Sequence, residues 1–105
     1  MITKKTKSRT MKTLEEIAGG ALTIGDLIHS IRLGEEISLA QLSSKLGVTL
    51  SHLCDIEKGR KTVSPERAAR FAKVLGRSRE QFVRLALQGI VNEAGLKMRV
   101  AVEAA

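Results

Sequence analysis

The sequence predicts an all-α protein, a compact bundle of five short helices followed by one C-terminal β-strand. Three observations lead to this fold class. The chain has 105 residues, of which 43% are apolar, and this suits a single domain with one hydrophobic core. At five places a Ser or Thr precedes a segment whose apolar residues recur at helical spacing, which is the pattern of successive capped helices. In the C-terminal segment the apolar residues fall on every second position, which indicates a strand.

The first two helices are predicted from capping boxes, in which a hydroxyl residue is followed by a polar residue three places on. Thr23 and Asp26 open the first helix, which we expect to end around Gly34. Ser38 and Gln41 open the second helix, whose apolar residues recur at intervals of three and four. The apolar stripe of this second helix is Leu39, Leu42 and Leu46.

The third helix follows the second after a turn of only three residues. Gly47 can adopt the left-handed conformation that ends a helix, and Thr49 is a good cap for the next one. This third helix is expected over residues 50–58, with Leu53 and Ile56 on its inner face.

The fourth and fifth helices have equally clear starts. Residues 64–66 read Ser-Pro-Glu, which places a cap, a proline at the first helical position and an acid near the helix N-terminus. The fourth helix is expected to run to Leu75. Ser78 with Gln81 caps the fifth helix, which is expected to fray near Gly95.

The two ends of the chain are expected to differ from this bundle. Residues 1–12 are predicted to be a flexible basic arm, and residues 13–22 a short helix or linker. Residues 93–105 contain the predicted strand, and a lone strand leaves its backbone groups unpaired. The possible pairing partners are the arm and the same strand of a second copy, and we expect a homodimer. The expected dimerisation residues are Leu96, Met98, Val100 and Val102.

The formal net charge of +7 is distributed unevenly along the chain. The arm carries five basic residues and no acid, whereas residues 13–57 contain seven acidic and two basic residues. Residues 58–79 contain eight basic residues and one acid, which gives +7 in a segment that is expected to be folded. A positive charge this dense suits contact with a polyanion such as nucleic acid, although a basic run can also be solvated surface.

Two short helices joined through residues 47–49, with a basic segment after the second, fit the pattern in which one helix enters the major groove of DNA. Residues 38–61 read SLAQLSSKLGVTLSHLCDIEKGRK, and this stretch resembles the Cro and phage-repressor (XRE-type) helix-turn-helix family. The resemblance covers roughly residues 24–86. It implies a lambda-repressor-like DNA-binding domain, which we place at residues 23–92.

The resemblance also implies roles for individual residues. Arg32 and Glu57 stand where the family has an ion pair between two helices, and Leu39 stands where family members usually have a glutamine. The positions that match phosphate-contacting residues are Lys58, Arg60 and Lys61. Apart from the resemblance, Thr49 at the start of the third helix suits a neutral phosphate contact. The positions that face or flank the bases are Leu50, Ser51, His52 and Asp55. None of these four is the Arg, Lys, Asn or Gln that reads a base through two hydrogen bonds, so we expect modest sequence specificity.

Other polar residues suggest no further chemistry. A single cysteine, Cys54, and two histidines do not make a zinc cluster, and no metal or cofactor is expected. No arrangement of a nucleophile with a histidine and an acid is evident, so we expect no enzyme activity. The apolar runs are too short to span a membrane, and the basic start leads into no secretory segment, so we expect a cytoplasmic protein.

Residues 67–73 place three more cations on one face of the fourth helix. Arg67, Arg70 and Lys73 suit either a second patch that contacts the DNA backbone or plain solvated surface.

The leading functional hypothesis is a sequence-specific regulator of transcription that binds duplex DNA as a homodimer and represses a promoter with an inverted-repeat operator. The alternative is an antitoxin that holds a toxin protein through its arm or its C-terminal strand and also regulates its own operon. A third hypothesis is an adaptor that uses the same fold to bind other proteins without contacting DNA.

Overall fold

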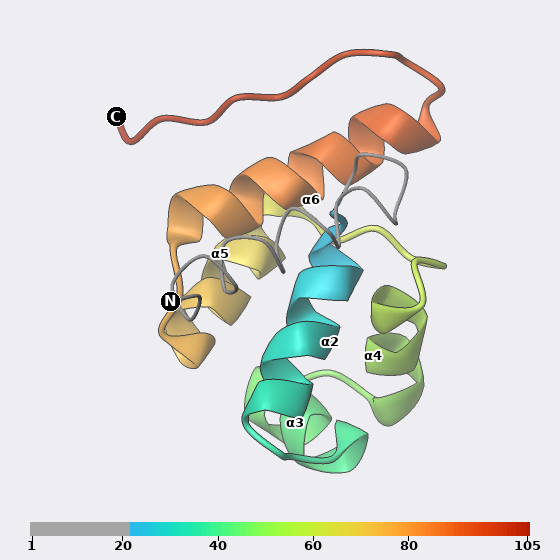
Figure 1. The fold of residues 1–105 in the computed structure, drawn as a ribbon, viewed down its shortest axis with the longest axis vertical. Helices are drawn as coiled ribbons and strands as arrows, with labels where there is room; N and C mark the ends of the chain where they lie inside the picture. Colours follow the sequence, from blue (N-terminus) through green and yellow to red (C-terminus); the bar gives the residue numbers. More distant parts are fainter. Residues whose placement is uncertain (1–21) are drawn as a thin grey trace, which may run out of the picture.

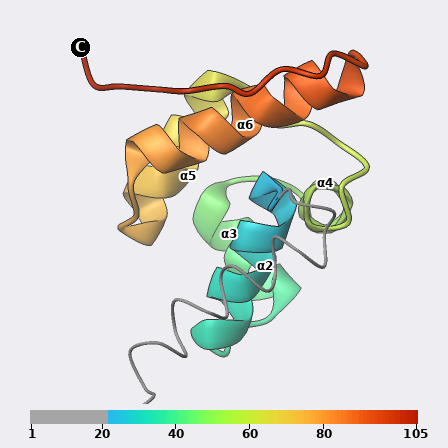
Figure 2. The ribbon, with the colours of Figure 1, turned by 45° about the horizontal axis from the view of Figure 1, so that its top comes forward.

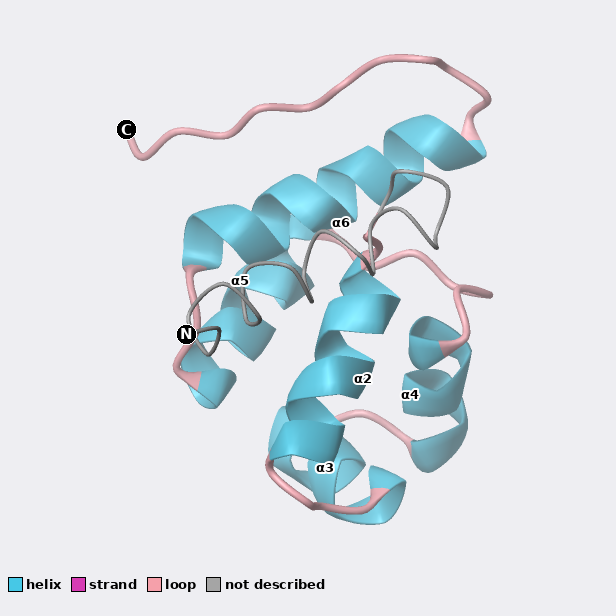
Figure 3. Ribbon diagram, viewed as in Figure 1, coloured by secondary structure: helices cyan, strands magenta, loops and turns pink. Residues whose placement is uncertain are grey.

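The computed structural model describes residues 22–105, and these residues form five α-helices connected by short turns (Figure 1). Figure 3 shows helices and loops but no strand in this part of the chain. The predicted basic arm at residues 1–12 and nearly all of the helix or linker predicted at residues 13–22 lie outside the described residues. The helices are α2 (Ile24–Gly34), α3 (Leu39–Leu46), α4 (Leu50–Glu57), α5 (Pro65–Leu75) and α6 (Arg79–Glu93).

The five helix starts lie where the capping pattern predicts them. Each helix is preceded by a hydroxyl residue in extended conformation whose oxygen accepts a hydrogen bond from the backbone N–H three residues on. In α2 the Thr23 hydroxyl accepts from the Asp26 N–H at 3.0 Å, and the Asp26 carboxylate accepts from the Thr23 N–H at 3.1 Å. This reciprocal arrangement satisfies two donors that a helix start otherwise leaves unpaired. The five caps are Thr23, Ser38, Thr49, Ser64 and Ser78.

One hydrophobic core joins all five helices. Its largest fully buried side chains are two phenylalanines, Phe71 on α5 and Phe82 on α6, and these two helices lie side by side (Figure 2). The predicted inner residues of α4, Leu53 and Ile56, are also buried. Val48, in the turn before α4, packs against this core while remaining partly exposed.

α2 lies very close to α4 at Gly25, in the first turn of α2. A β-carbon at this position would overlap the carbonyl oxygen of Ile56, near the end of α4. Only glycine therefore allows the backbone of α2 to lie this close to α4, and this contact fixes the distance between the two helices.

The predicted C-terminal strand is not formed in the described chain. Gly95, with φ of 77°, ends α6 in a left-handed turn, and the Leu96 N–H donates to the Val91 carbonyl at 3.2 Å. Residues 96–105, called the tail below, then run back along α6 as an extended segment (Figures 1 and 2). The period-two pattern predicts an extended backbone correctly, but a strand needs a second strand, and residues 22–105 supply none.

The side chain of Gln88, on α6, takes the place of that missing strand. Its Nε2 donates to the Met98 carbonyl at 2.8 Å, and its Oε1 accepts from the Val100 N–H at 2.8 Å. The predicted dimerisation residues consequently separate into two pairs. Val100 and Val102 are half-buried, whereas Leu96 and Met98 are exposed.

Candidate nucleic-acid interface

The turn between α3 and α4 has the geometry that its sequence predicts. Gly47 adopts the left-handed conformation, with φ of 72°, and the Val48 N–H donates to the Ser43 carbonyl at 3.0 Å, which ends α3. Two residues later the Thr49 hydroxyl accepts from the His52 N–H at 3.0 Å and starts α4. The chain thus reverses between two eight-residue helices within three residues.

The burial of Leu53 and Ile56 determines which side of α4 faces outward. Leu50 is 50% exposed and Ser51 is also exposed, so both of these predicted base-facing residues lie on the open side. His52 and Asp55 are only half-buried, and each has a neighbour. Arg60 lies 3.5 Å from the Asp55 carboxylate, at the outer limit for a hydrogen bond.

His52 is held by a residue of α5. The Nη1 of Arg67 lies 2.9 Å from the Nε2 of His52. An arginine only donates hydrogen bonds, so Nε2 of His52 is the accepting nitrogen in this contact. Nδ1 of His52 can therefore donate a hydrogen bond to another group, whereas Nε2 is already bonded to Arg67.

A second arginine of α5 supports the turn itself. The Nη1 of Arg70 donates to the carbonyl oxygen of Leu46 at 2.9 Å, and Leu46 is the last residue of α3. The sequence left open whether Arg67 and Arg70 form a DNA-contacting patch or a solvated surface. The structure places both against the α3–α4 pair, whereas Lys73 is exposed and makes no hydrogen bond or ion pair within residues 22–105.

The predicted phosphate-contacting residues surround α4 at its two ends. Thr49 is exposed at its start, and Lys58, Arg60 and Lys61 are exposed directly after its last turn. Gly59, with φ of 76°, turns the chain between these cations. The three basic side chains therefore lie beside the end of α4 and are accessible to an anion.

Arg32 and Glu57 form an ion pair between α2 and α4. The Nε of Arg32 lies 2.8 Å from one carboxylate oxygen of Glu57, and a second guanidinium nitrogen lies 3.1 Å from the other. Arg32 also donates to the carbonyl of Ile37 at 3.2 Å, so it connects α2 with α4 and with the turn before α3. His29, whose side chain is 47% exposed, places Nδ1 2.8 Å from the same carboxylate.

Burial and hydrogen bonding act in opposite directions on this pair. The Glu57 side chain is 6% exposed, and burial alone raises the pKa of a carboxyl group. Hydrogen bonds and electrostatic attraction from Arg32 and His29 together outweigh burial and leave the pKa of Glu57 below its ordinary value. The hydrogen bond that Arg32 donates to Glu57 in turn raises the pKa of Arg32. Glu57 is therefore a carboxylate near neutral pH, and it fixes the end of α4 on α2.

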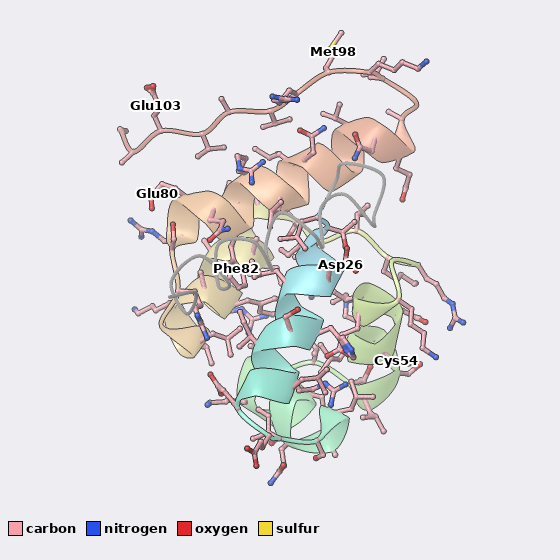
Figure 4. The ribbon with its side chains drawn as sticks, in the orientation of Figure 1. Asp26, Cys54, Glu80, Phe82, Met98 and Glu103 are labelled. Carbon is pink, nitrogen blue, oxygen red and sulfur yellow. The ribbon has the colours of Figure 1, made fainter. Side chains whose placement is uncertain are left out.

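The part of the chain that the structure describes contains no group of three or more His, Cys, Asp or Glu side chains suited to a metal ion. None of its helices is long and apolar enough to cross a membrane. Cys54, on α4, is half-buried (labelled in Figure 4).

A protein-family model described as helix-turn-helix matches residues 28–82, which is just over half of the chain. The match includes α3, α4 and the turn between them. The chain belongs to the helix-turn-helix family. This helix-turn-helix protein is of the XRE type, and it is a DNA-binding regulator of transcription. No curated protein sequence and no solved structure matches the chain.

Proposed function

We propose that this helix-turn-helix regulator is a repressor that binds an inverted-repeat operator as a homodimer. The observation that carries the proposal is the exposed side of α4, bordered at its C-terminal end by Lys58, Arg60 and Lys61. In a dimer, two copies of α4 related by a twofold axis enter successive major grooves about 34 Å apart. The bound dimer then blocks access to a promoter.

Base recognition is proposed to come from the exposed side of α4. Leu50 contacts a thymine methyl, Ser51 donates to or accepts from a base edge, and Asp55 accepts from a cytosine amine. His52 donates through Nδ1, because Arg67 occupies its Nε2. These contacts are few, so sequence-dependent DNA shape contributes to specificity as well.

Affinity is proposed to come from phosphate contacts. Lys58, Arg60 and Lys61 neutralise backbone phosphates, and the Thr49 hydroxyl donates a neutral hydrogen bond near the start of α4. Arg60 also lies 3.5 Å from the Asp55 carboxylate. Its guanidinium has five N–H donors, so it can contact a phosphate while it keeps this neighbour.

The proposal is tested by selection from a pool of random DNA duplexes at two salt concentrations, followed by sequencing of the retained DNA. We expect enrichment of an inverted repeat and affinity that falls steeply as salt rises. Replacing both Arg60 and Lys61 by Ala should reduce the slope of log affinity against log salt by about 2. The matched control is Lys73→Ala, which removes an exposed cation from α5. No enrichment, or a slope unchanged by the double replacement, would refute DNA recognition by this surface.

A further inference from the structure

Along one edge of the tail, backbone groups form hydrogen bonds with Gln88, and along the other edge they form none within residues 22–105. Gln88 bonds the Met98 carbonyl and the Val100 N–H, which belong to alternate residues of an extended segment. In such a segment, the backbone groups of alternate residues point to the same side. The backbone groups of residues 98, 100 and 102 therefore point towards α6, and those of residues 97, 99, 101 and 103 point away from it.

The edge that points away from α6 makes no hydrogen bond within residues 22–105. No described element lies beyond it in Figure 1, where the tail is the outermost segment above α6. A row of unpaired N–H and C=O groups on an extended backbone is a template for pairing with another strand. We call this edge, at residues 97–103, the outer edge.

We propose that the outer edge pairs with the outer edge of a second copy in antiparallel orientation. This pairing supplies the dimer on which the proposed function rests. A twofold axis uses the same surface on both copies, so the two edges meet with opposite directions. The two tails then form a two-stranded ribbon that is held against each α6 by Gln88.

The direction of the backbone groups restricts how the two tails are aligned. Both residues of each hydrogen-bonded pair must come from the outer edge, so the twofold axis passes through one residue and its copy. An axis at Arg99 would set two arginines opposite each other. An axis at Val100 sets Glu103 opposite Lys97, and an axis at Ala101 sets Glu103 opposite Arg99. An axis at Val102 pairs no opposite charges.

Charge complementarity therefore selects the two central alignments. In each of them Glu103 of one copy lies directly opposite one cation and diagonal to the other, within reach of both. The twofold axis repeats this contact, so each dimer has it twice. Lys97, Arg99 and Glu103 are all exposed in the single chain. In Figure 4, Glu103 and Met98 extend from the tail away from α6, and Met98 is 63% exposed.

The test is sedimentation equilibrium of the full chain without DNA. We expect a concentration-dependent dimer and at least tenfold weaker self-association for Glu103→Lys. Adding Lys97→Glu or Arg99→Glu to this variant should restore association, and the better of the two identifies the alignment. The matched control is Glu93→Lys, which makes the same charge change at an exposed position of α6 and should leave association unchanged.

A second variant tests the support that α6 gives to the tail. Gln88→Ala should also weaken self-association at least tenfold while leaving the helical circular dichroism spectrum unchanged. The proposal is overturned by a monomer at all concentrations, by equal association of the Glu103→Lys and Glu93→Lys variants, or by failure of both second-site changes to restore the dimer. A different protein found bound to the tail in place of a second copy would also overturn it.

These outcomes are separable from failure of the proposed function. A monomer that enriches a single half-site from the duplex pool overturns the tail pairing and leaves DNA recognition intact. A dimer that responds to Glu103 but enriches no duplex supports the tail pairing and overturns the repressor.

Discussion

The turn between α3 and α4 and the C-terminal tail both lie on the surface, but they are held by different numbers of contacts. Arg70 bonds the end of α3, Arg67 bonds a side chain of α4, and Arg32 pairs with Glu57 at the end of α4. These three arginines come from two other helices. Within residues 22–105, the tail beyond Leu96 forms its side-chain hydrogen bonds with Gln88 alone.

This difference indicates which part of the molecule we expect to be rigid and which part we expect to open locally. Contacts from several elements connect the α3–α4 pair to the rest of the domain, so we expect it to open only when the whole domain unfolds. A segment with half-buried side chains and one supporting residue opens locally at a low free energy. We therefore expect changes around α4 to lower global stability and changes at the tail to leave it nearly unchanged.

The largest effect is expected for Gly25→Ala. The added methyl group overlaps the carbonyl oxygen of Ile56, and backbone cannot move aside as a flexible side chain can. We expect a loss of about 4 kcal/mol in the free energy of unfolding, above the usual range for overpacked sites. Chemical denaturation followed by circular dichroism measures this loss.

Gly89→Ala is the matched control for that experiment. Gly89 lies inside α6, and a β-carbon there meets no atom within 4 Å. Because alanine is the better helix former, we expect this variant to gain up to about 1 kcal/mol. Equal behaviour of the two variants would mean that α2 and α4 are not in close backbone contact.

The next largest effect is expected for Glu57→Ala. This change leaves the guanidinium of Arg32, whose side chain is only 13% exposed, without its charged partner. Removal of one partner of a buried pair costs about 3 kcal/mol. Denaturation of Glu57→Ala and of Glu66→Ala, an exposed acid on α5, provides the comparison. A loss no larger than that of the control would contradict a structural role for the pair.

A smaller, pH-dependent effect follows from the lowered pKa of Glu57. The unfolded chain binds a proton at Glu57 more readily than the folded chain does. The contribution of the Glu57 carboxylate to stability is therefore complete when the pH is above 4.5, the ordinary pKa of this group. It is lost as the pH falls through the lower pKa of the folded state. Denaturation midpoints between neutral and acid pH should show this loss in the native chain. They should show less of it in Glu57→Gln, where no carboxyl group titrates.

The smallest effect on global stability is expected for Gln88→Ala. The tail loses its two hydrogen bonds with the Gln88 side chain, yet no residue of the tail belongs to the buried core. We expect a change below about 0.5 kcal/mol in the free energy of unfolding. Hydrogen exchange at the Val100 N–H should become faster in the same variant. A large loss of global stability would show that the tail is part of the cooperative unit.

The sequence predicts the helix starts well because a cap is a local interaction. Thr23 and Asp26 are three residues apart, and their pattern can be found without knowing the fold. The pair formed by Arg67 and His52 joins residues that are 15 apart, and the bond from Arg70 to Leu46 spans 24. No local pattern marks these contacts, because they depend on how α5 packs on the α3–α4 pair.

The sequence predicts the backbone conformation of the tail but not its hydrogen-bond partners. Alternation of apolar residues predicts an extended backbone, and the tail is extended (Figure 1). The same alternation does not predict which groups form hydrogen bonds with the tail backbone. No sequence pattern distinguishes Gln88 from the other polar residues on the outer face of its helix. The base-facing and phosphate-contacting residues on and around α4 stay predictions, since they depend on bound DNA.

The caps at the starts of the five described helices also bear on how fast the chain folds. Each cap closes a hydrogen bond over three residues, so it forms without a search for distant partners. Nucleation is the slow and unfavourable step of helix formation, and a local acceptor for the first N–H groups lowers its cost. Refolding from denaturant should therefore be complete within about a millisecond, as in other small helical domains. A newly made chain would then reach its folded form long before it meets DNA.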